Sequence, residues 1–315
     1  KKMVAEHLEE LISLKENGGK LWYEAAVCGS IPIVKTLDQF YNHEPIHEIS
    51  GIFNGSSNYI LSRIEQDGLD YQQALKLAQD KGFAESNPAL DVGGHDTMNK
   101  LVILLCHAYG IATTPSSLCT VGIQHLQKED FTFARDQGYR IKLIAKSIKE
   151  SGRVHAFVIP CFVQQSHDLY HVNDEFNAVF ISGKYTDDHL FTGKGAGGAP
   201  TAASVIADIF ATADPMDYHY YKWQTQDTTT YSNSIDIPVY LRYTSINQLE
   251  ELAVENIIKQ GTYDQGGYAV GTISLHNLWS LNTYIDQQGI SLVAGSLLGR
   301  AIVETEGKHQ ETVVN

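Results

Sequence analysis

The clearest structural signal in this sequence is the segment His-Asp-Thr-Met-Asn-Lys-Leu-Val-Ile-Leu-Leu-Cys-His-Ala-Tyr, which occupies residues 95–109. Its apolar side chains recur at the spacing of one helical face, at Met98, Leu101, Leu105 and Ala108, and Gly110 is placed to end a helix. The pattern therefore predicts a helix over residues 95–109 that packs into the core.

The segments on either side of this helix predict the fold class. Before it, periodicity indicates helices over 3–15, 59–66 and 70–81 and strands over 20–27 and 46–53. After it, alternation indicates strands over 141–148, 154–163 and 178–182, and a helix over 200–211. A polar stretch at 213–235 precedes strands over 237–243, 268–275 and 290–294 that alternate with helices over 246–259 and 279–287. We expect an α/β (α+β) protein, with a mixed sheet covered by helices and a small α+β module at its C-terminal end.

Composition and charge exclude several classes of protein. The 315 residues are 43% hydrophobic with a net charge of −14, which suits a folded chain and disfavours a nucleic-acid partner. The longest apolar run, residues 101–106, is far shorter than the roughly 20 residues that cross a bilayer, and the first residues do not form a signal peptide. The four cysteines lack Cys-x-x-Cys spacing, which suits a reducing compartment. We therefore expect a cytoplasmic protein without membrane partners.

One segment has the residue types of a metal-binding motif but not the helix that the motif requires. His43-Glu-Pro-Ile-His47 matches H-E-x-x-H, the helical zinc site of metalloproteases. Pro45 would cost about 3 kcal/mol inside the helix that this site requires. The alternating residues that follow favour a strand, so we reject a metalloprotease.

Asp96 and Lys100 stand four residues apart at the start of the predicted helix and share one of its faces. Spacing alone favours a surface ion pair, while a functional lysine held in its ammonium form by the carboxylate could pass a proton to a substrate oxygen. Glu85 and Asp91 precede the helix and could bind an ammonium group, although exposed loop acids usually have no specific role.

A glycine-rich segment, Gly193-Lys-Gly-Ala-Gly-Gly-Ala-Pro-Thr201, precedes the helix predicted over 200–211. Such a loop lets backbone N–H groups approach an anion at a helix N-terminus, and a tight turn is the equally simple alternative. The spacing is not that of a P-loop, which disfavours a nucleoside triphosphatase.

Read in order, these segments resemble the homoserine dehydrogenase family. The resemblance rests on Glu24-Ala-Ala-Val-Cys-Gly-Ser-Ile-Pro-Ile33, Gly51-Ile-Phe-Asn-Gly-Ser-Ser-Asn-Tyr-Ile-Leu61, Gly82-Phe-Ala-Glu-Ser-Asn-Pro-Ala-Leu-Asp-Val92, the helix with Asp96 and Lys100, and residues 193–208. It covers roughly residues 1–211. The sequence departs from the family pattern at four positions, which are Ser30, Ser56, Asn87 and Gly93.

The resemblance implies a set of site residues. Lys100 would be the catalytic proton donor and acceptor, with Asp96 as its partner and a substrate contact. Glu85 and Asp91 would hold the amino group of the substrate, and Gly197 and Lys1 would lie near an NAD(P) cofactor. Backbone carbonyls would bind a monovalent cation, Na⁺ or K⁺, namely those of Glu24, Val27, Gly29 and Ile31.

The family also implies an activity, which is the reversible NAD(P)-dependent reduction of L-aspartate 4-semialdehyde to L-homoserine in threonine, methionine and isoleucine biosynthesis. The sequence lacks the family's G-x-G-x-x-G fingerprint and its first residue falls inside a predicted helix, so we expect a fragment that is inactive alone. The sequence does not distinguish NAD from NADP as the cofactor. The competing hypothesis is a non-catalytic fragment for oligomerisation or amino-acid sensing.

The expected domain organisation has four parts. Residues 1–30 would be the remnant of a Rossmann nucleotide-binding domain, and 31–212 the catalytic and dimerisation domain of a homodimer. Residues 213–236 would be a linker, and 237–315 an ACT-like regulatory domain of βαββα type. The ACT resemblance rests on element order and on Val239-Tyr-Leu-Arg-Tyr243. The usual turn residues after the first strand of an ACT domain are absent here, so threonine binding, dimerisation and simple scaffolding stay open alternatives for this module.

Overall fold

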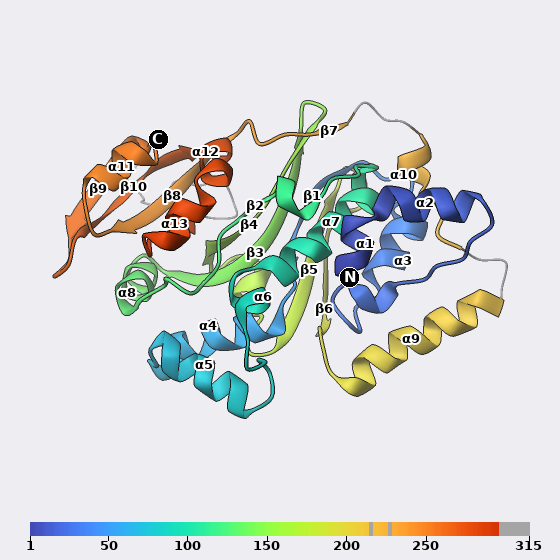
Figure 1. Ribbon diagram of the computed structural model, residues 1–315, viewed down its shortest axis with the longest axis horizontal. Helices are drawn as coiled ribbons and strands as arrows, with labels where there is room; N and C mark the ends of the chain where they lie inside the picture. Colours follow the sequence, from blue (N-terminus) through green and yellow to red (C-terminus); the bar gives the residue numbers. More distant parts are fainter. Residues whose placement is uncertain (214–216, 226–228, 296–315) are drawn as a thin grey trace, which may run out of the picture.

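The computed structural model describes residues 1–213, 217–225 and 229–295. Within these residues the strands join into one sheet that runs through the whole molecule, with α-helices layered on it (Figure 1). The order along the sheet is β6 (Asp187–Lys194), β5 (Phe176–Gly183), β1 (Ile46–Ile52), β3 (Tyr139–Glu150), β4 (Arg153–Gln164), β11 (Ser291–Ala294), β8 (Asp236–Tyr243), β10 (Gly267–Ser274) and β9 (Glu255–Thr262). Two short strands, β2 (Cys119–Thr120) and β7 (Thr230–Tyr231), pair with β4 in parallel. The predicted α/β class with a mixed sheet is confirmed.

The long hairpin β3–β4 is the centre of the sheet. Its strands pair from Glu150 opposite Arg153 down to Tyr139 opposite Gln164. Ser151 and Gly152 both have positive φ, 49° and 79°, as a tight hairpin turn with the twist of its strands requires. Both strands are buried over most of their length, because helices cover one face and the C-terminal module and a loop cover part of the other.

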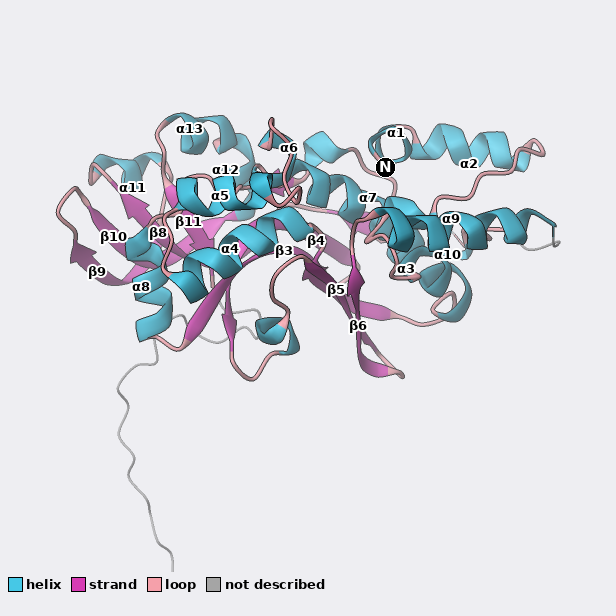
Figure 2. Cartoon of the chain, turned by 90° about the horizontal axis from the view of Figure 1, so that it is seen from below, coloured by secondary structure: helices cyan, strands magenta, loops and turns pink. Residues whose placement is uncertain are grey.

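The helices α4 (Gly55–Asp67), α5 (Tyr71–Asp80), α6 (Ala89–Val92) and α7 (His95–Tyr109) lie on one face of this sheet (Figure 2). Helix α7 begins after Gly94 and ends before Gly110, and both glycines adopt the left-handed conformation. From Asp96 to Tyr109 every residue of α7 except Met98 is buried, so the predicted helix is confirmed but is enclosed on all sides. Helix α1 (Lys2–Glu6) packs beside it, followed by α2 (Leu8–Glu16).

Several predicted elements are wrong in ways that tertiary contacts explain. Residues 20–27 form a loop and a 3₁₀ turn (Glu24–Ala26) instead of a strand, because Tyr23 is drawn into a buried hydrogen bond of 2.7 Å with His107. The helix expected over 3–15 is interrupted at His7, which has φ −127°. The helix expected over 246–259 ends early as α11 (Asn247–Glu251), and the chain continues as the exposed edge strand β9.

Other helices and strands extend or divide what the sequence predicts. The structure adds α3 (Ile33–Lys35), α8 (Lys128–Asp136) and strand β6, whose exposed residues give little apolar pattern. Helix α9 (Gly198–Ala213) begins two residues before the expected start. The helix expected over 279–287 is two short ones, α12 (Leu275–Ser280) and α13 (Asn282–Gln287). Part of the expected linker is packed into the molecule, since Tyr218 and Tyr220 beside α10 (Tyr221–Gln224) are buried.

The C-terminal module has the element order β8–α11–β9–β10–α12–α13–β11 and the strand order β11-β8-β10-β9, with every neighbouring pair antiparallel. This is the split βαβ arrangement of ferredoxin-like folds. Strand β11 also pairs in parallel with β4, so the module extends the main sheet. Its kinship to ACT domains stays a prediction, and residues 296–315 of the expected domain lie outside the described residues. No helix in the described part of the chain is long and apolar enough to cross a membrane.

Candidate active site

Lys100 lies on the second turn of α7, with only 6% of its surface exposed. Its Nζ is 2.8 Å from Oδ2 of Asp96 and donates a hydrogen bond to the backbone oxygen of Phe53, the first residue after β1. Burial alone would lower the pKa of Lys100, but Asp96 and other negative groups outweigh burial and raise the pKa above its usual value. The pair is therefore a buried ammonium–carboxylate pair and not the exposed ion pair that spacing alone favoured.

Asp96 lies between two lysines. Besides Lys100, the Nζ of Lys1 forms an ion pair with the other carboxylate oxygen, Oδ1. Burial favours the neutral acid, but the charges of Lys100 and Lys1 dominate and hold the pKa of Asp96 well below its usual range. Lys1, which we expected near a cofactor, thus contacts the predicted catalytic carboxylate.

Asn54 joins Asp96 to Asp91. Its Nδ2 donates hydrogen bonds of 2.7 Å to Oδ1 of Asp91 and 3.0 Å to Oδ2 of Asp96. Its Oδ1 accepts a hydrogen bond from the backbone N–H of Ser57, which caps the N-terminus of α4. Burial raises the pKa of Asp91, helped by the neighbouring charge of Asp96 and opposed by Asn54. One amide therefore keeps two like-charged carboxylates side by side.

Asn54 was not among the site residues predicted from the sequence. The residue stands in the quoted segment 51–61, and its position just before a predicted helix was a signal for an N-cap. Nothing in the local sequence, however, shows that its amide group faces acids 37 and 42 residues further along the chain.

Glu85 does not contact this cluster by any hydrogen bond or ion pair found among the described residues. It is exposed, and its backbone oxygen accepts a hydrogen bond of 3.1 Å from Gln79. Its expected role in substrate binding stays a prediction.

The glycine-rich loop at 193–198 lies against the turn at residues 28–31. Ser30 donates hydrogen bonds to the backbone oxygen of Lys194 from its N–H, at 3.1 Å, and from its hydroxyl, at 3.0 Å. A Cβ on Gly29 would lie 2.5 Å from the backbone oxygen of Gly195, so the two backbones are in direct contact. Gly197 has φ +116° and is exposed, which leaves the outer side of the loop open to a ligand.

The four carbonyls expected to bind a cation belong to the turn at residues 24–31, where Cys28 and Gly29 both have positive φ. The carbonyl of Gly29 accepts a hydrogen bond of 2.8 Å from the hydroxyl of Ser204, and that of Ile31 accepts one of 2.8 Å from the N–H of Ile33. A carbonyl oxygen has two lone pairs, so these hydrogen bonds leave an acceptor site on each for a hard cation. The backbone carbonyls of Val27 and Glu24 are the other two of the four expected cation ligands.

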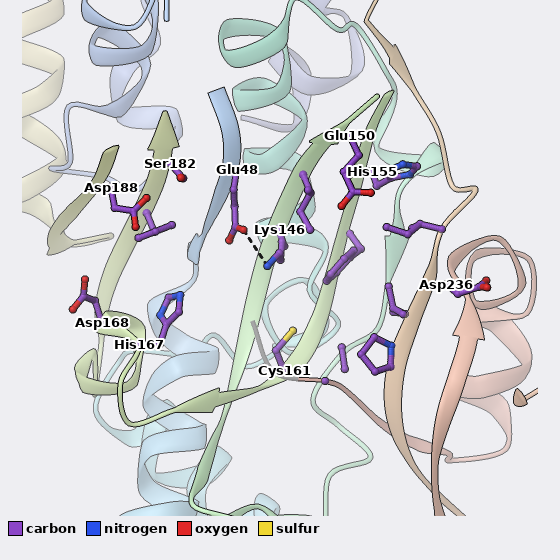
Figure 3. Close-up of a pocket in the computed structure, with 18 of the residues that line it drawn as sticks. Glu48, Lys146, Glu150, His155, Cys161, His167, Asp168, Ser182, Asp188 and Asp236 are labelled. Carbon is purple, nitrogen blue, oxygen red and sulfur yellow. Dashed lines mark ion pairs between the residues drawn. The ribbon is translucent and has the colours of Figure 1, made fainter. Parts of the chain in front are cut away.

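A cavity of about 640 Å³ opens on the other face of the sheet, and Lys100 is not among the residues that line it. Figure 3 shows this cavity with its lining side chains. Its lining includes Glu48 and Lys146, whose charged groups are 3.2 Å apart. Lys146 and its neighbour Ser147 point to opposite faces of β3, and Ser147 contacts Tyr109 of α7. The cavity therefore belongs to the face opposite the helices and is separate from the Lys100 cluster.

Comparisons with known proteins identify the family of this chain. The homoserine dehydrogenase family pattern matches residues 32–210. The homoserine dehydrogenase of Lactococcus lactis is 40% identical over 210 residues, which are 66% of this chain and 49% of that protein. The Bacillus subtilis homoserine dehydrogenase is 36% identical over 208 residues. The chain thus spans about half the length of the curated relatives it matches.

Solved structures of homoserine dehydrogenases also resemble the overall fold of this chain. A homoserine dehydrogenase from Thiobacillus denitrificans superposes with a TM-score of 0.78 at 28% identity, covering 94% of this chain and 75% of that one. A hyperthermophilic archaeal homoserine dehydrogenase solved in complex with NADPH has a TM-score of 0.58 at 26% identity, covering 69% of this chain and 63% of that one. By fold, the protein resembles dehydrogenases of known structure. By sequence, it belongs to the homoserine dehydrogenase family.

Proposed function

We propose that this chain supplies the substrate site and the proton-transfer lysine for the reversible NAD(P)-dependent reduction of L-aspartate 4-semialdehyde to L-homoserine, in threonine, methionine and isoleucine biosynthesis. The observation that carries the proposal is the buried Lys100–Asp96 pair, with Asp91 beside it and Asn54 joining the two acids. NADPH in the archaeal relative supports a nicotinamide cofactor.

Lys100 is suited to the proton step of this reaction. The cofactor, when bound, supplies the hydride that turns the aldehyde carbon into an alcohol carbon. The developing alkoxide oxygen is a far stronger base than a lysine amine, so the ammonium group of Lys100 first stabilises its charge and then protonates it. Asp96 keeps Lys100 charged before the reaction, because its carboxylate raises the pKa of the amine.

The other polar groups would orient the substrate. The carboxylate of Asp91 would bind the ammonium group of the substrate, with Glu85 as a second, exposed acid on the same loop. Asp96 would contact the substrate beside Lys100. Gly197 and Lys1 would lie near the cofactor, since the open backbone at Gly197 permits close approach and Lys1 already borders Asp96. The carbonyls of residues 24–31 would hold Na⁺ or K⁺.

Three further proposals concern a cytoplasmic location, a homodimer and a threonine effector. Light scattering of the purified protein would test the homodimer. A threonine effector on the C-terminal module is tested by calorimetric titration with L-threonine. The absence of heat in that titration would leave the module with a structural role.

The substrate assignment is tested by calorimetry with two ligands. L-Homoserine and L-2-aminobutyrate differ by the hydroxyl that Lys100 would contact, so homoserine is expected to bind more tightly. The difference should disappear in Lys100→Met. Equal binding of the two ligands by the unaltered protein would refute the role of Lys100. A second assay extends the protein upstream to the length of its relatives and measures NADPH oxidation with aspartate semialdehyde.

A further inference from the structure

A turn at residues 122–126 connects the candidate active site to the C-terminal module. On the site side, the N–H of Ile123 donates a hydrogen bond of 2.8 Å to the backbone oxygen of Val92. Val92 is the last residue of α6, the short helix that carries Asp91. A Cβ on Gly122 would lie 2.5 Å from that same oxygen and 2.8 Å from Cα of Gly93, so the turn is in backbone contact with the end of α6.

On its other side, the turn is held by helix α13 of the module. Oδ1 of Asp286 accepts hydrogen bonds of 2.8 Å from Nε2 of Gln124 and 2.8 Å from Nε2 of His125. A third contact comes from strand β8, where Arg242 donates a hydrogen bond of 2.7 Å to the backbone oxygen of His125. Two residues of the turn are thus fixed by side chains from two elements of the module.

The side chain of Arg242 is held in place by a buried carboxylate. Its Nε is 2.9 Å from Oδ1 of Asp130, a fully buried carboxylate at the start of α8. Asp130 also accepts hydrogen bonds from Tyr240, at 2.9 Å, and from Ser291, at 2.8 Å. Separating a buried pair of this kind is costly, so the module cannot shift at this point without disturbing the turn.

Helix α13 faces the start of α7 across a pocket of about 230 Å³, lined on one side by Gly93 and His95 and on the other by Asn282 and Asp286. The turn at 122–126 lies beside this space and joins α13 to α6, since it contacts Asp286 on one side and Val92 on the other. A displacement of α13 would therefore reach α6 through the turn.

We propose that the C-terminal module positions Asp91 in the substrate site through the turn at 122–126, with Asp286 as the positioning residue. The inference rests on the proposed function, because it assigns to the module control over the acid that binds the substrate ammonium group. Asp286 contacts the turn and not Asp91 itself, so it would act by fixing the turn against which α6 rests.

The test is the affinity for L-homoserine, measured by isothermal titration calorimetry on the full chain. Asp286→Ala is expected to weaken binding about 2- to 30-fold, the range typical of such coupling. The melting temperature should change little, because Asp286 is largely exposed. The matched control is Asp264→Ala, which removes the same charge from an exposed position in the same module and should leave the affinity unchanged.

Gly122→Ala perturbs the other end of the same connection and should also weaken binding. If both changes act through one turn, the double variant loses less affinity than the product of the two single losses. An Asp286→Ala variant that is folded and binds homoserine as tightly as the unaltered protein would overturn the inference, and so would full additivity in the double variant. Failure of the unaltered chain to bind homoserine would instead count against the proposed function.

Discussion

The amide nitrogen of Asn54 donates a hydrogen bond of 2.7 Å to Oδ1 of Asp91, and the same nitrogen is 3.0 Å from the carboxylate of Asp96. These acids come from α6 and α7, and both are partly or wholly removed from water. Two adjacent carboxylates repel one another, so a neutral donor shared by both lowers the cost of holding them together.

Asn54→Ser should therefore separate the roles of this residue. Serine retains the oxygen that caps α4 but lacks the amide that holds the acids, so stability should fall by about 1.5–3 kcal/mol, the range for a hydrogen bond to a charged group. Homoserine affinity should fall about tenfold, the effect of losing a hydrogen bond to a charged group. Calorimetry and thermal unfolding of the same variant measure the two quantities. Unchanged affinity would show that Asn54 is only a helix cap.

Lys100→Ala should abolish most of the chemistry and preserve the fold. In the protein extended to the length of its relatives, turnover is expected to fall about 10²- to 10⁴-fold because the proton donor is lost. Asp96 keeps Lys1 as a partner, so the loss of stability should be smaller than the about 3–5 kcal/mol of a wholly unpaired buried charge. Lys128→Ala, an exposed lysine at the start of α8, is the control.

The oxidation of homoserine should speed up as the solution becomes more alkaline. In that direction Lys100 must act as a base, so it must first lose its proton. Its pKa lies above the usual 10.5 because Asp96 and other negative groups outweigh the effect of burial. The logarithm of kcat/KM for homoserine should rise with a slope near one across the alkaline range, while the reduction of the aldehyde should lack this rise. A flat profile for oxidation would point to a base other than Lys100.

Lys142 should make stability depend on pH. It is fully buried on β3 and donates hydrogen bonds to Asn58, Asn173 and the backbone oxygen of Val172. Burial lowers its pKa to about 8, so between pH 8 and 10.5 the unfolded chain binds the proton that the folded protein releases. The free energy of unfolding should therefore gain about 2 kcal/mol between pH 7 and 9.5 from this residue. Urea unfolding of Lys142→Met at both pH values should lack this gain, and titrating tyrosines cancel in the comparison.

Asp130→Ala should show that the C-terminal module and the main sheet unfold as one unit. The substitution leaves Arg242 buried without its carboxylate and is expected to lower the free energy of unfolding by about 3–5 kcal/mol. Because β11 pairs with both β4 and β8, circular dichroism and tyrosine fluorescence should report one common transition. Asp136→Ala, at the exposed end of α8, is the control. Two separated transitions in the unaltered protein would contradict the prediction.

Features that depend on neighbouring residues could be predicted from the sequence alone. Helix α7 has its predicted bounds because its apolar spacing and the glycine after it are local signals. The β3–β4 hairpin follows from two alternating runs around Ser151 and Gly152. Asp96 and Lys100 contact one another because residues four apart on a helix share a face.

Features that join distant segments could not be predicted in this way, because they depend on the packing of the whole fold. The burial of Lys100, the contact of Lys1 with Asp96 and the shared amide of Asn54 all depend on how α1, α4, α6 and α7 pack together. The strand expected over 20–27 is absent, and Tyr23 instead makes a buried hydrogen bond with His107, a residue 84 positions away that no local pattern reveals. Local hydrogen bonds and turn conformations are encoded by adjacent residues, whereas burial and long-range contacts are fixed only when the whole sheet and its helices have assembled.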